Sequence, residues 1–349
     1  MVTGLVRYHN SVHRKGVEEG EASRFRVTAA HRTAVLACHQ ARLRADDPPN
    51  ALSGLAACAA AGALRVEVDV TFTADDVPVL SHDEMFLVGG RRMPARAVSA
   101  DQIPGVVRLA EAVDALAGRG CVLQVDLKRR GPITPGEVAA LADAVRPLGP
   151  SVIVGSQAHW NLRAIAEAGL TVAFDPTLHF RYVPRSAPSW WAEGVPRRTG
   201  AWGFRDDAAY DADRGWDFDR YLGARLDDLV ALVPSCVELM VDIGTVMRIG
   251  ELGVALGEEL RRRGVALAVW TIRRCEGDAT AALVARLLEL GASTIITDVP
   301  LELGEVMRAR VTTGHDHATG SLPTVPGSAV AGRSNVSSRE DGLRKGEGT

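Results

Sequence analysis

Short apolar runs alternate with longer segments rich in alanine, leucine and arginine between about residues 26 and 312. The short runs have the length of strands, and the longer segments have the spacing of amphipathic helices. Strands are expected at residues 26–31, 64–70, 121–127, 151–155, 171–175, 236–242, 265–272 and 293–297. Helices are expected at residues 51–62, 108–117, 136–146, 160–169, 249–263 and 278–290. This alternation predicts an α/β protein whose parallel strands close into a (β/α)8 TIM barrel. An open doubly wound sheet is the alternative, but no GxGxxG motif follows the first strand.

Two segments interrupt the alternation. Residues 71–105 form a small insertion after the second strand. Residues 176–235 form a long, aromatic-rich insertion between strands five and six, and hold four of the six tryptophans. Long insertions in a compact domain are usually lids or binding loops, so a substrate lid is one interpretation. A small packed subdomain is the other.

The two ends of the chain differ from its middle in composition. Residues 1–24 form a polar extension without the apolar run of a signal peptide, and residues 25–312 form one barrel domain. Residues 313–349 are rich in Gly, Ser, Thr and Pro, which predicts a disordered tail. No apolar run reaches about 18 residues, so no membrane span is expected. The five cysteines are scattered without a CxxC spacing, which fits a reducing compartment and a cytoplasmic protein.

The charge balance excludes some partners. The formal net charge is −3, which gives no support for nucleic-acid binding. No basic amphipathic stretch is evident, so no stable membrane association is expected.

Acidic side chains occupy one face of two predicted strands. In residues 65–70 the valines alternate with Glu67 and Asp69, so both acids point away from the valine face. The next strand repeats this phase with Asp126 and is followed by Lys128. If the valines face the helices, three carboxylates meet at the carboxyl rim of the barrel, where such barrels carry their chemistry. Buried carboxylates need a cation, and oxygen ligands favour Mg²⁺, with Mn²⁺ or Ca²⁺ as alternatives.

Histidines and further basic residues are predicted at the same rim. The first expected strand ends in His31-Arg32, and His82 ends the apolar run VPVL. Histidines beside a metal suit acid–base catalysis, and Arg32 and Lys128 suit phosphate binding. Each also has a structural interpretation, because His31 could be a core histidine and a His-Asp pair is common in turns. Trp270 is expected either to line the substrate pocket or to belong to the core.

These residues occur in motifs that run along the whole predicted barrel in order. The motifs are AHR at 30–32, PPN at 48–50, GALRVEVDVTFTADDVPVLSHD at 62–83, LQVDLK at 123–128, VWTI at 269–272 and GASTIITDVP at 291–300. In these the chain resembles the glycerophosphodiester phosphodiesterase family. The resemblance implies a (β/α)8 barrel with a small insertion after strand two. It also implies metal ligands at Glu67, Asp69 and Asp126, a catalytic pair at His31 and His82, and phosphate contacts at Arg32 and Lys128.

The chain departs from the family pattern at three places. It reads HRT instead of HRG at 31–33, PPN instead of PEN at 48–50, and Asp126 instead of Glu in the E-x-K motif. All three changes touch the predicted rim and leave the core pattern intact. We interpret them as a retained catalytic centre with a changed substrate.

The resemblance implies a metal-dependent phosphodiesterase that hydrolyses a small phosphorylated, glycerophosphodiester-like substrate to an alcohol and a phosphomonoester. Two alternatives stay open. The first is a lyase or cyclase, or an enzyme acting on a diphosphate-bearing specialised metabolite. The second is a non-catalytic phosphate-binding barrel. The sequence does not predict the oligomeric state.

Overall fold

The computed structural model describes residues 23–182 and 218–312. The polar extension before residue 23, the four tryptophans of the long insertion and the tail after residue 312 lie outside the described residues. The interpretations made for them therefore stay predictions. Within the described ranges, no helix is both long enough and apolar enough to cross a membrane.

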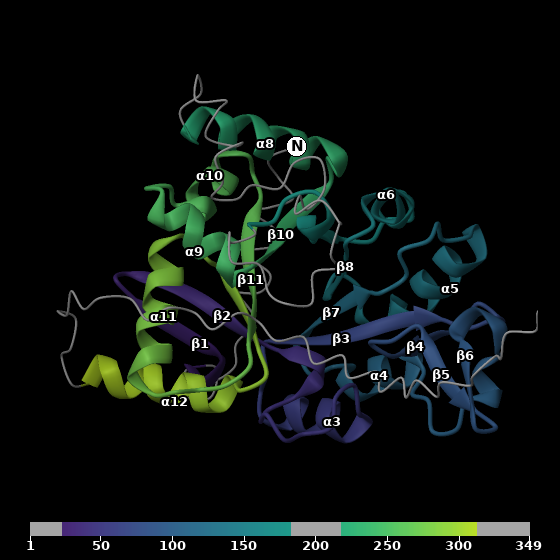
Figure 1. Ribbon diagram of the computed structural model, residues 1–349. Helices are drawn as coiled ribbons and strands as arrows, with labels where there is room; N and C mark the ends of the chain where they lie inside the picture. Colours follow the sequence, from purple (N-terminus) through teal and green to yellow (C-terminus); the bar gives the residue numbers. More distant parts are fainter. Residues whose placement is uncertain (1–22, 183–217, 313–349) are drawn as a thin grey trace, which may run out of the picture.

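Eight parallel strands form a closed barrel, which confirms the predicted fold class (Figure 1). The strands follow the order β2–β12–β11–β10–β9–β8–β7–β3, and β3 pairs again with β2. Their bounds are β2 Arg32–Cys38, β3 Arg65–Phe72, β7 Val122–Leu127, β8 Val152–Ser156, β9 Val172–Phe174, β10 Cys236–Asp242, β11 Ala266–Ile272 and β12 Thr294–Thr297. The closing pair β2–β3 matches only Ala37 with Arg65 and Cys38 with Val66. We call this short junction the barrel seam.

The first barrel strand is not the one that the sequence predicts. Residues Arg26–Ala29 form β1, which pairs antiparallel with β2 through a two-residue turn at Ala30 and His31. Both turn residues adopt positive φ angles, of 48° and 63°. Because β2 is the strand that joins the barrel, His31 and Arg32 lie at its amino-terminal start. The prediction that they occupy the carboxyl rim is therefore wrong.

Helices surround the barrel on its outer side (Figure 1). They are α3 Leu52–Ala60, α4 Leu109–Leu116, α5 Pro135–Val145, α6 His159–Glu167, α8 Phe218–Leu232, α9 Ile243–Glu251, α10 Leu256–Arg262, α11 Asp278–Glu289 and α12 Pro300–Thr312. The helix expected at 249–263 is two helices, because Gly253 between them takes a φ of 92° and ends the first. Short 3-10 turns are η1 Ser23–Phe25, η2 His39–Ala41, η3 Ala95–Ala97, η4 Ala100–Gln102, η5 Arg146–Leu148 and η6 Pro176–Leu178.

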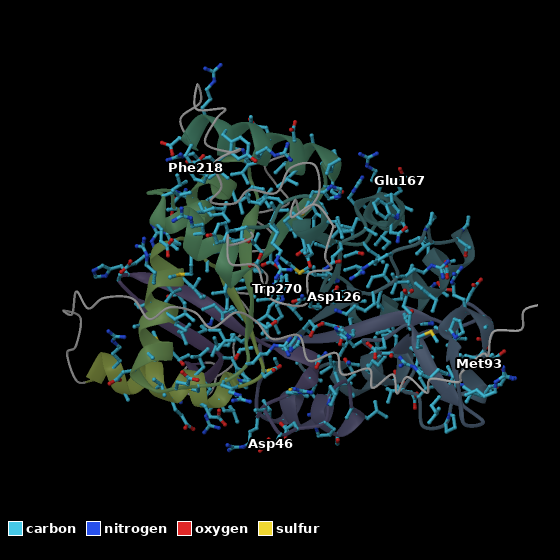
Figure 2. All side chains as sticks on the ribbon, viewed as in Figure 1. Asp46, Met93, Asp126, Glu167, Phe218 and Trp270 are labelled. Carbon is cyan, nitrogen blue, oxygen red and sulfur yellow. The ribbon has the colours of Figure 1, made fainter. Side chains whose placement is uncertain are left out.

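The insertion after β3 has regular structure of its own. Strand β4 (Pro78–Leu80) pairs antiparallel with the carboxyl end of β3. Strands β5 (Met85–Val88) and β6 (Arg91–Pro94) form a separate two-stranded hairpin. This hairpin lies at one side of the molecule, and Figure 2 labels its Met93 at the outer edge of the view, while Asp126 and Trp270 appear near the centre.

The barrel separates two apolar regions. Val66, Val68 and Val70 of β3 belong to the large core between the strands and the helices, as their alternation predicts. A smaller cluster fills the barrel interior, and Trp270 packs against it. Its members are Ala37, Val122, Ile153, Ala173, Met240, Ala268 and Ile296. The interior face of β3 therefore carries Arg65, Glu67 and Asp69, all buried.

The amino-terminal part of the barrel interior holds a buried polar network. Arg65 Nη2 lies 2.5 Å from Glu238 Oε2, and its Nη1 lies 3.2 Å from Glu238 Oε1. Arg65 Nε donates to Gln124 Oε1 at 2.9 Å, and Thr294 Oγ1 donates to Glu238 Oε1 at 3.0 Å. One cation and one carboxylate therefore neutralise each other, with further hydrogen bonds to both.

Candidate active site

Three carboxylates converge where β3 and β7 end. Ligand oxygens of Glu67, Asp69 and Asp126 all lie within 4.8 Å of one another. Asp69 and Asp126 are register partners on adjacent parallel strands, so the two side chains leave the sheet at the same level. Glu67 and Asp69 are buried, and Glu67 Oε1 has no hydrogen-bond partner among the described residues. Burial, and then the neighbouring charge of Asp69, raise the pKa of Glu67 to about 8. This oxygen-only donor set fits a hard divalent cation.

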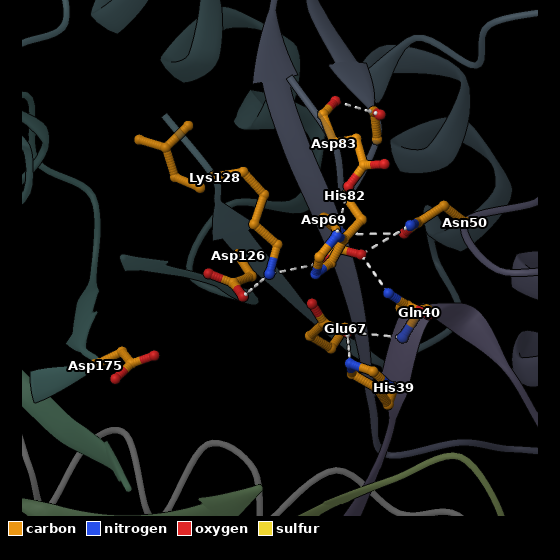
Figure 3. A network of polar contacts seen from close by, with 12 residues as sticks. His39, Gln40, Asn50, Glu67, Asp69, His82, Asp83, Asp126, Lys128 and Asp175 are labelled. Carbon is orange, nitrogen blue, oxygen red and sulfur yellow. Dashed lines mark hydrogen bonds and ion pairs between the residues drawn. The ribbon is translucent and has the colours of Figure 1, made fainter. Parts of the chain in front are cut away.

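Lys128 follows β7 and supplies positive charge to this cluster. Its Nζ lies 2.8 Å from Asp69 Oδ1 and 2.5 Å from Asp126 Oδ2 (Figure 3). Burial alone would lower the pKa of Lys128, but the negative charges of Asp126 and Asp69 outweigh it and raise the pKa. One lysine thus faces three carboxylates, which leaves the cluster short of positive charge.

Amide side chains from the segment after β2 orient two of the acids. The backbone N–H of Gln40 donates to Glu67 Oε2 at 2.7 Å, and Gln40 Nε2 donates to Asp69 Oδ2 at 2.7 Å. Asn50 Nδ2 donates to the same Asp69 oxygen at 2.9 Å, and Asn50 Oδ1 accepts the backbone N–H of Asp69 at 3.0 Å (Figure 3). These contacts hold both carboxylates in place from one side.

His39 occupies the rim position that was predicted for His31. It directly follows Cys38, the last residue of β2. Its Nδ1 lies 2.5 Å from Asp298 Oδ1 after β12, and its Nε2 lies 3.9 Å from Glu67 Oε2. Burial opposes the charged imidazolium, but the charge of Glu67 and the hydrogen bond to Asp298 outweigh it and raise the pKa of His39.

Sequence reasoning missed this histidine. The signal that could have found it is the apolar run Ala34–Cys38, which has the length of a buried strand and ends directly at His39. Only two residues separate the end of β1 from the start of β2, so a pattern of well-separated strands does not distinguish it from β1.

His82 lies on the insertion side of the cluster. The backbone N–H of Ser81 donates to the carbonyl oxygen of Asp69 at 3.0 Å, which fixes the chain next to the end of β3. His82 Nδ1 lies 3.0 Å from Asp83 Oδ1, and its side chain is 62% exposed. Figure 3 draws both residues in the same close-up as Asp69. The structure thus brings His82, Lys128 and the three acids to one rim, and places His31 and Arg32 elsewhere.

Two further side chains lie at or below this rim. Trp270 faces the barrel interior, and its Nε1 donates to the Met240 carbonyl oxygen at 3.1 Å. Asp175 follows β9 and accepts hydrogen bonds from Thr177 and Gln157. Burial raises the pKa of Asp175 to about 6. Figure 3 shows Asp175 on the side of Asp126 that faces away from Asp69.

Part of the chain that forms this site is similar to a known protein family. Residues 43–145 match the model of the glycerophosphoryl diester phosphodiesterase family. The match includes Asn50, the three acids, His82 and Lys128, and it begins after His39. No curated protein matches the chain.

Solved structures with the same fold are similar over most of the chain. A candidate glycerophosphoryl diester phosphodiesterase from Silicibacter pomeroyi has a TM-score of 0.53 at 16% identity, covering 83% of this chain and 97% of that one. A glycerophosphodiester phosphodiesterase from Parabacteroides distasonis has a TM-score of 0.51 at 15% identity, covering 79% and 97%. The enzyme from Thermotoga maritima has a TM-score of 0.50 at 16% identity, covering 78% and 98%. At these identities the structures show a shared fold alone. The chain is similar to the glycerophosphoryl diester phosphodiesterase family over residues 43–145, the stretch that holds the three acids, His82 and Lys128.

Proposed function

We propose that the protein is a divalent-metal-dependent phosphodiesterase that hydrolyses a glycerophosphodiester-like substrate to an alcohol and a phosphomonoester. The observation that carries this proposal is the cluster of Glu67, Asp69 and Asp126 beside Lys128, because three acids with one lysine leave room for a cation. Mg²⁺ is the cation we expect, and Mn²⁺ and Ca²⁺ share its preference for oxygen ligands.

The carboxylates and the lysine would act on the phosphate. A divalent cation held by the three acids supplies Lewis-acid stabilisation of the charge that develops on the phosphodiester oxygens. Lys128 shares that charge through its ammonium group. Gln40 and Asn50 keep Asp69 oriented, so the site needs little rearrangement when the substrate binds.

His39 and His82 divide the proton transfers. Asp298 accepts the Nδ1 proton of His39, which leaves Nε2 directed toward the metal cluster. In this arrangement Asp298 is a positioning residue. One histidine removes a proton from the attacking water, and the other protonates the leaving alkoxide. His82, exposed beside Asp83, has access to the solvent for this exchange.

The test is turnover on a panel of glycerophosphodiesters with Mg²⁺, Mn²⁺ or Ca²⁺ and with a chelator, with products identified by mass. We expect metal-dependent release of a phosphomonoester, and a loss of about 10² to 10⁴ in rate for His39→Ala and for His82→Ala. His31→Ala is the matched control, because this histidine is exposed in the β1–β2 turn, and it should retain full turnover.

Other outcomes would replace the proposal. A cyclic phosphate or inorganic diphosphate among the products would favour the lyase, cyclase or diphosphate reactions. Metal binding without turnover on any phosphodiester would favour a binding barrel. Full activity of His39→Ala would show that this histidine has no part in proton transfer.

A further inference from the structure

The β5–β6 hairpin is the part of the insertion that reaches furthest from the barrel in Figure 1. It begins at Met85, two residues after Asp83, and a backbone hydrogen bond from Ala95 N to the Glu84 carbonyl oxygen closes its base. Its tip is Gly89-Gly90, with both residues at positive φ. The hairpin therefore projects beside the entrance of the proposed catalytic centre.

The two faces of the hairpin differ in exposure. Phe86 and Val88 are partly buried, whereas Met85 is 39% and Leu87 is 65% exposed. The strand register places Leu87 opposite Arg92 and Met85 opposite Pro94, so these four side chains share the outward face. Two of the six exposed large apolar side chains of the described residues therefore lie on this one hairpin face.

The hairpin strands carry only positive charge, and the nearest acids in the chain are the exposed Asp83 and Glu84 at the base of the hairpin. Arg91, Arg92 and Arg96 are exposed, and none of them has an ion pair within the described ranges. No acidic residue occurs from Met85 to Ala97. Helical surface arginines behave differently, since Arg146, Arg261 and Arg262 each contact a carboxylate three residues away.

A second group of exposed arginines follows two of the barrel strands. Arg130 follows β7, and Arg273 and Arg274 follow β11, so all three lie at the carboxyl end of the barrel. They are exposed, and their side chains have no ion pair in the part of the chain that is described. Three exposed arginines thus lie at the end of the barrel that carries the catalytic centre, although the whole chain has a formal net charge of −3.

We propose that the β5–β6 hairpin docks reversibly on the surface of an anionic lipid bilayer. Met85 and Leu87 enter the interface, while the arginines contact lipid phosphates with their guanidinium groups and lay their alkyl stems along the acyl boundary. An apolar hairpin face flanked by unpaired cations is complementary to such a surface, where anionic headgroups lie over hydrocarbon. No membrane association was expected, because the chain has no basic amphipathic stretch with helical spacing. In the hairpin the apolar and polar side chains instead alternate every second residue, as in a strand.

The test is co-sedimentation of the full chain with vesicles of phosphatidylglycerol and phosphatidylcholine, compared with vesicles of phosphatidylcholine alone. We expect binding to the anionic vesicles that weakens as salt is added. Leu87→Ser and the double variant Arg91→Gln/Arg92→Gln should each weaken binding by about tenfold. Turnover on a soluble phosphodiester should not change, so failure of docking can be told apart from failure of the proposed reaction.

Matched controls come from other exposed positions. Leu252→Ser removes an apolar side chain that is 38% exposed beside α9, and Arg261→Gln/Arg262→Gln removes two arginines from α10. Both should bind vesicles like the wild type. Three results would overturn the proposal: no preference for anionic vesicles at low salt, equal binding by hairpin and control variants, or a dimer in light scattering that Leu87→Ser dissociates.

Discussion

Strand β3 places charged side chains at both ends of the barrel interior, but their charges are balanced differently at the two ends. At the amino-terminal end, Arg65 is paired with Glu238 and held by Gln124 and Thr294. At the carboxyl end, two residues further along, Glu67 and Asp69 lie with Asp126 beside Lys128, and His39 Nε2 lies 3.9 Å from Glu67.

This difference in charge balance distinguishes a structural ion pair from a cluster that can bind a ligand. A buried pair with matched charges and full hydrogen bonding is complete without any further group. A cluster of three carboxyl groups beside one lysine, with Glu67 Oε1 unpartnered among the described residues, has oxygen atoms free to bind a cation. The first arrangement therefore maintains the barrel, and the second is available for binding. The predictions below test this contrast from the largest effect to the smallest.

Removing one partner of the buried Arg65–Glu238 pair should have the largest effect on stability. Arg65→Met leaves the Glu238 carboxylate, 1% exposed, without its cation, and should lower the free energy of unfolding by about 3–5 kcal/mol. Chemical denaturation measures this loss. Arg65→Met/Glu238→Met removes both charges and should recover most of it. Equal losses in the single and double variants would show that the pair is not a matched unit.

The carboxylate cluster at the other end of the barrel should instead make stability depend on a divalent cation. At a free Mg²⁺ concentration about 100 times the dissociation constant, the wild type should gain about 2.7 kcal/mol of stability. Thermal unfolding with and without the cation measures the gain. Glu67→Gln should leave the metal-free stability nearly unchanged and abolish the gain, because it removes one ligand charge. A metal-induced gain of the same size in Glu67→Gln would place the cation elsewhere.

Metal affinity should also depend on pH. Burial and the charge of Asp69 raise the pKa of Glu67 from 4.5 to about 8, so at pH 7 this carboxyl is mostly protonated and must lose its proton to bind the cation. The apparent affinity should rise by up to about tenfold per pH unit below pH 8 and level off above it. The sign for the metal-free protein is opposite: its stability should fall as the pH rises from 4.5 to about 8, because only the unfolded chain ionises there. Calorimetry in two buffers of different ionisation enthalpy counts the released proton, and none released at pH 7 would contradict this.

The smallest effect is expected at Arg32. It forms a partly exposed ion pair with Glu258 of α10 at the amino-terminal side of the barrel. Arg32→Ala should therefore change stability by less than about 1 kcal/mol and leave turnover unchanged. Steady-state kinetics beside chemical denaturation tests both. A large loss of turnover would show that Arg32 contacts the substrate after all.

The face of the β3 acids could be predicted because a strand in a closed barrel is constrained on both sides. Val66, Val68 and Val70 pack against helices, and this leaves Glu67 and Asp69 only the interior. The same period placed Asp126 and Lys128. Such alternation is a strong signal, since a shift of one residue would place carboxylates among the core valines.

The start of the barrel could not be predicted in the same way. The β1–β2 turn is built from Ala30 and His31 at positive φ, where glycine or asparagine is usual, so the sequence carries no hairpin signal. Without that signal, β1 was assigned as the barrel strand and its histidine as catalytic. The pairing of His39 with Asp298 joins residues 259 positions apart, and no local pattern indicates such a contact.

The barrel seam has a consequence for motion. Because β2 and β3 match at only two residue pairs, opening this junction breaks fewer backbone hydrogen bonds than opening any of the longer pairs, such as β3 with β7. Amide hydrogen exchange should therefore be faster along Ala37 and Cys38 than in the middle of β7. Gln40 links the two sides of the seam through its hydrogen bonds to Glu67 and Asp69, the same carboxylates that would bind a cation. Cation binding should slow amide hydrogen exchange at the barrel seam. The exchange rates of Ala37 and Cys38 would then measure how much of the metal site is occupied.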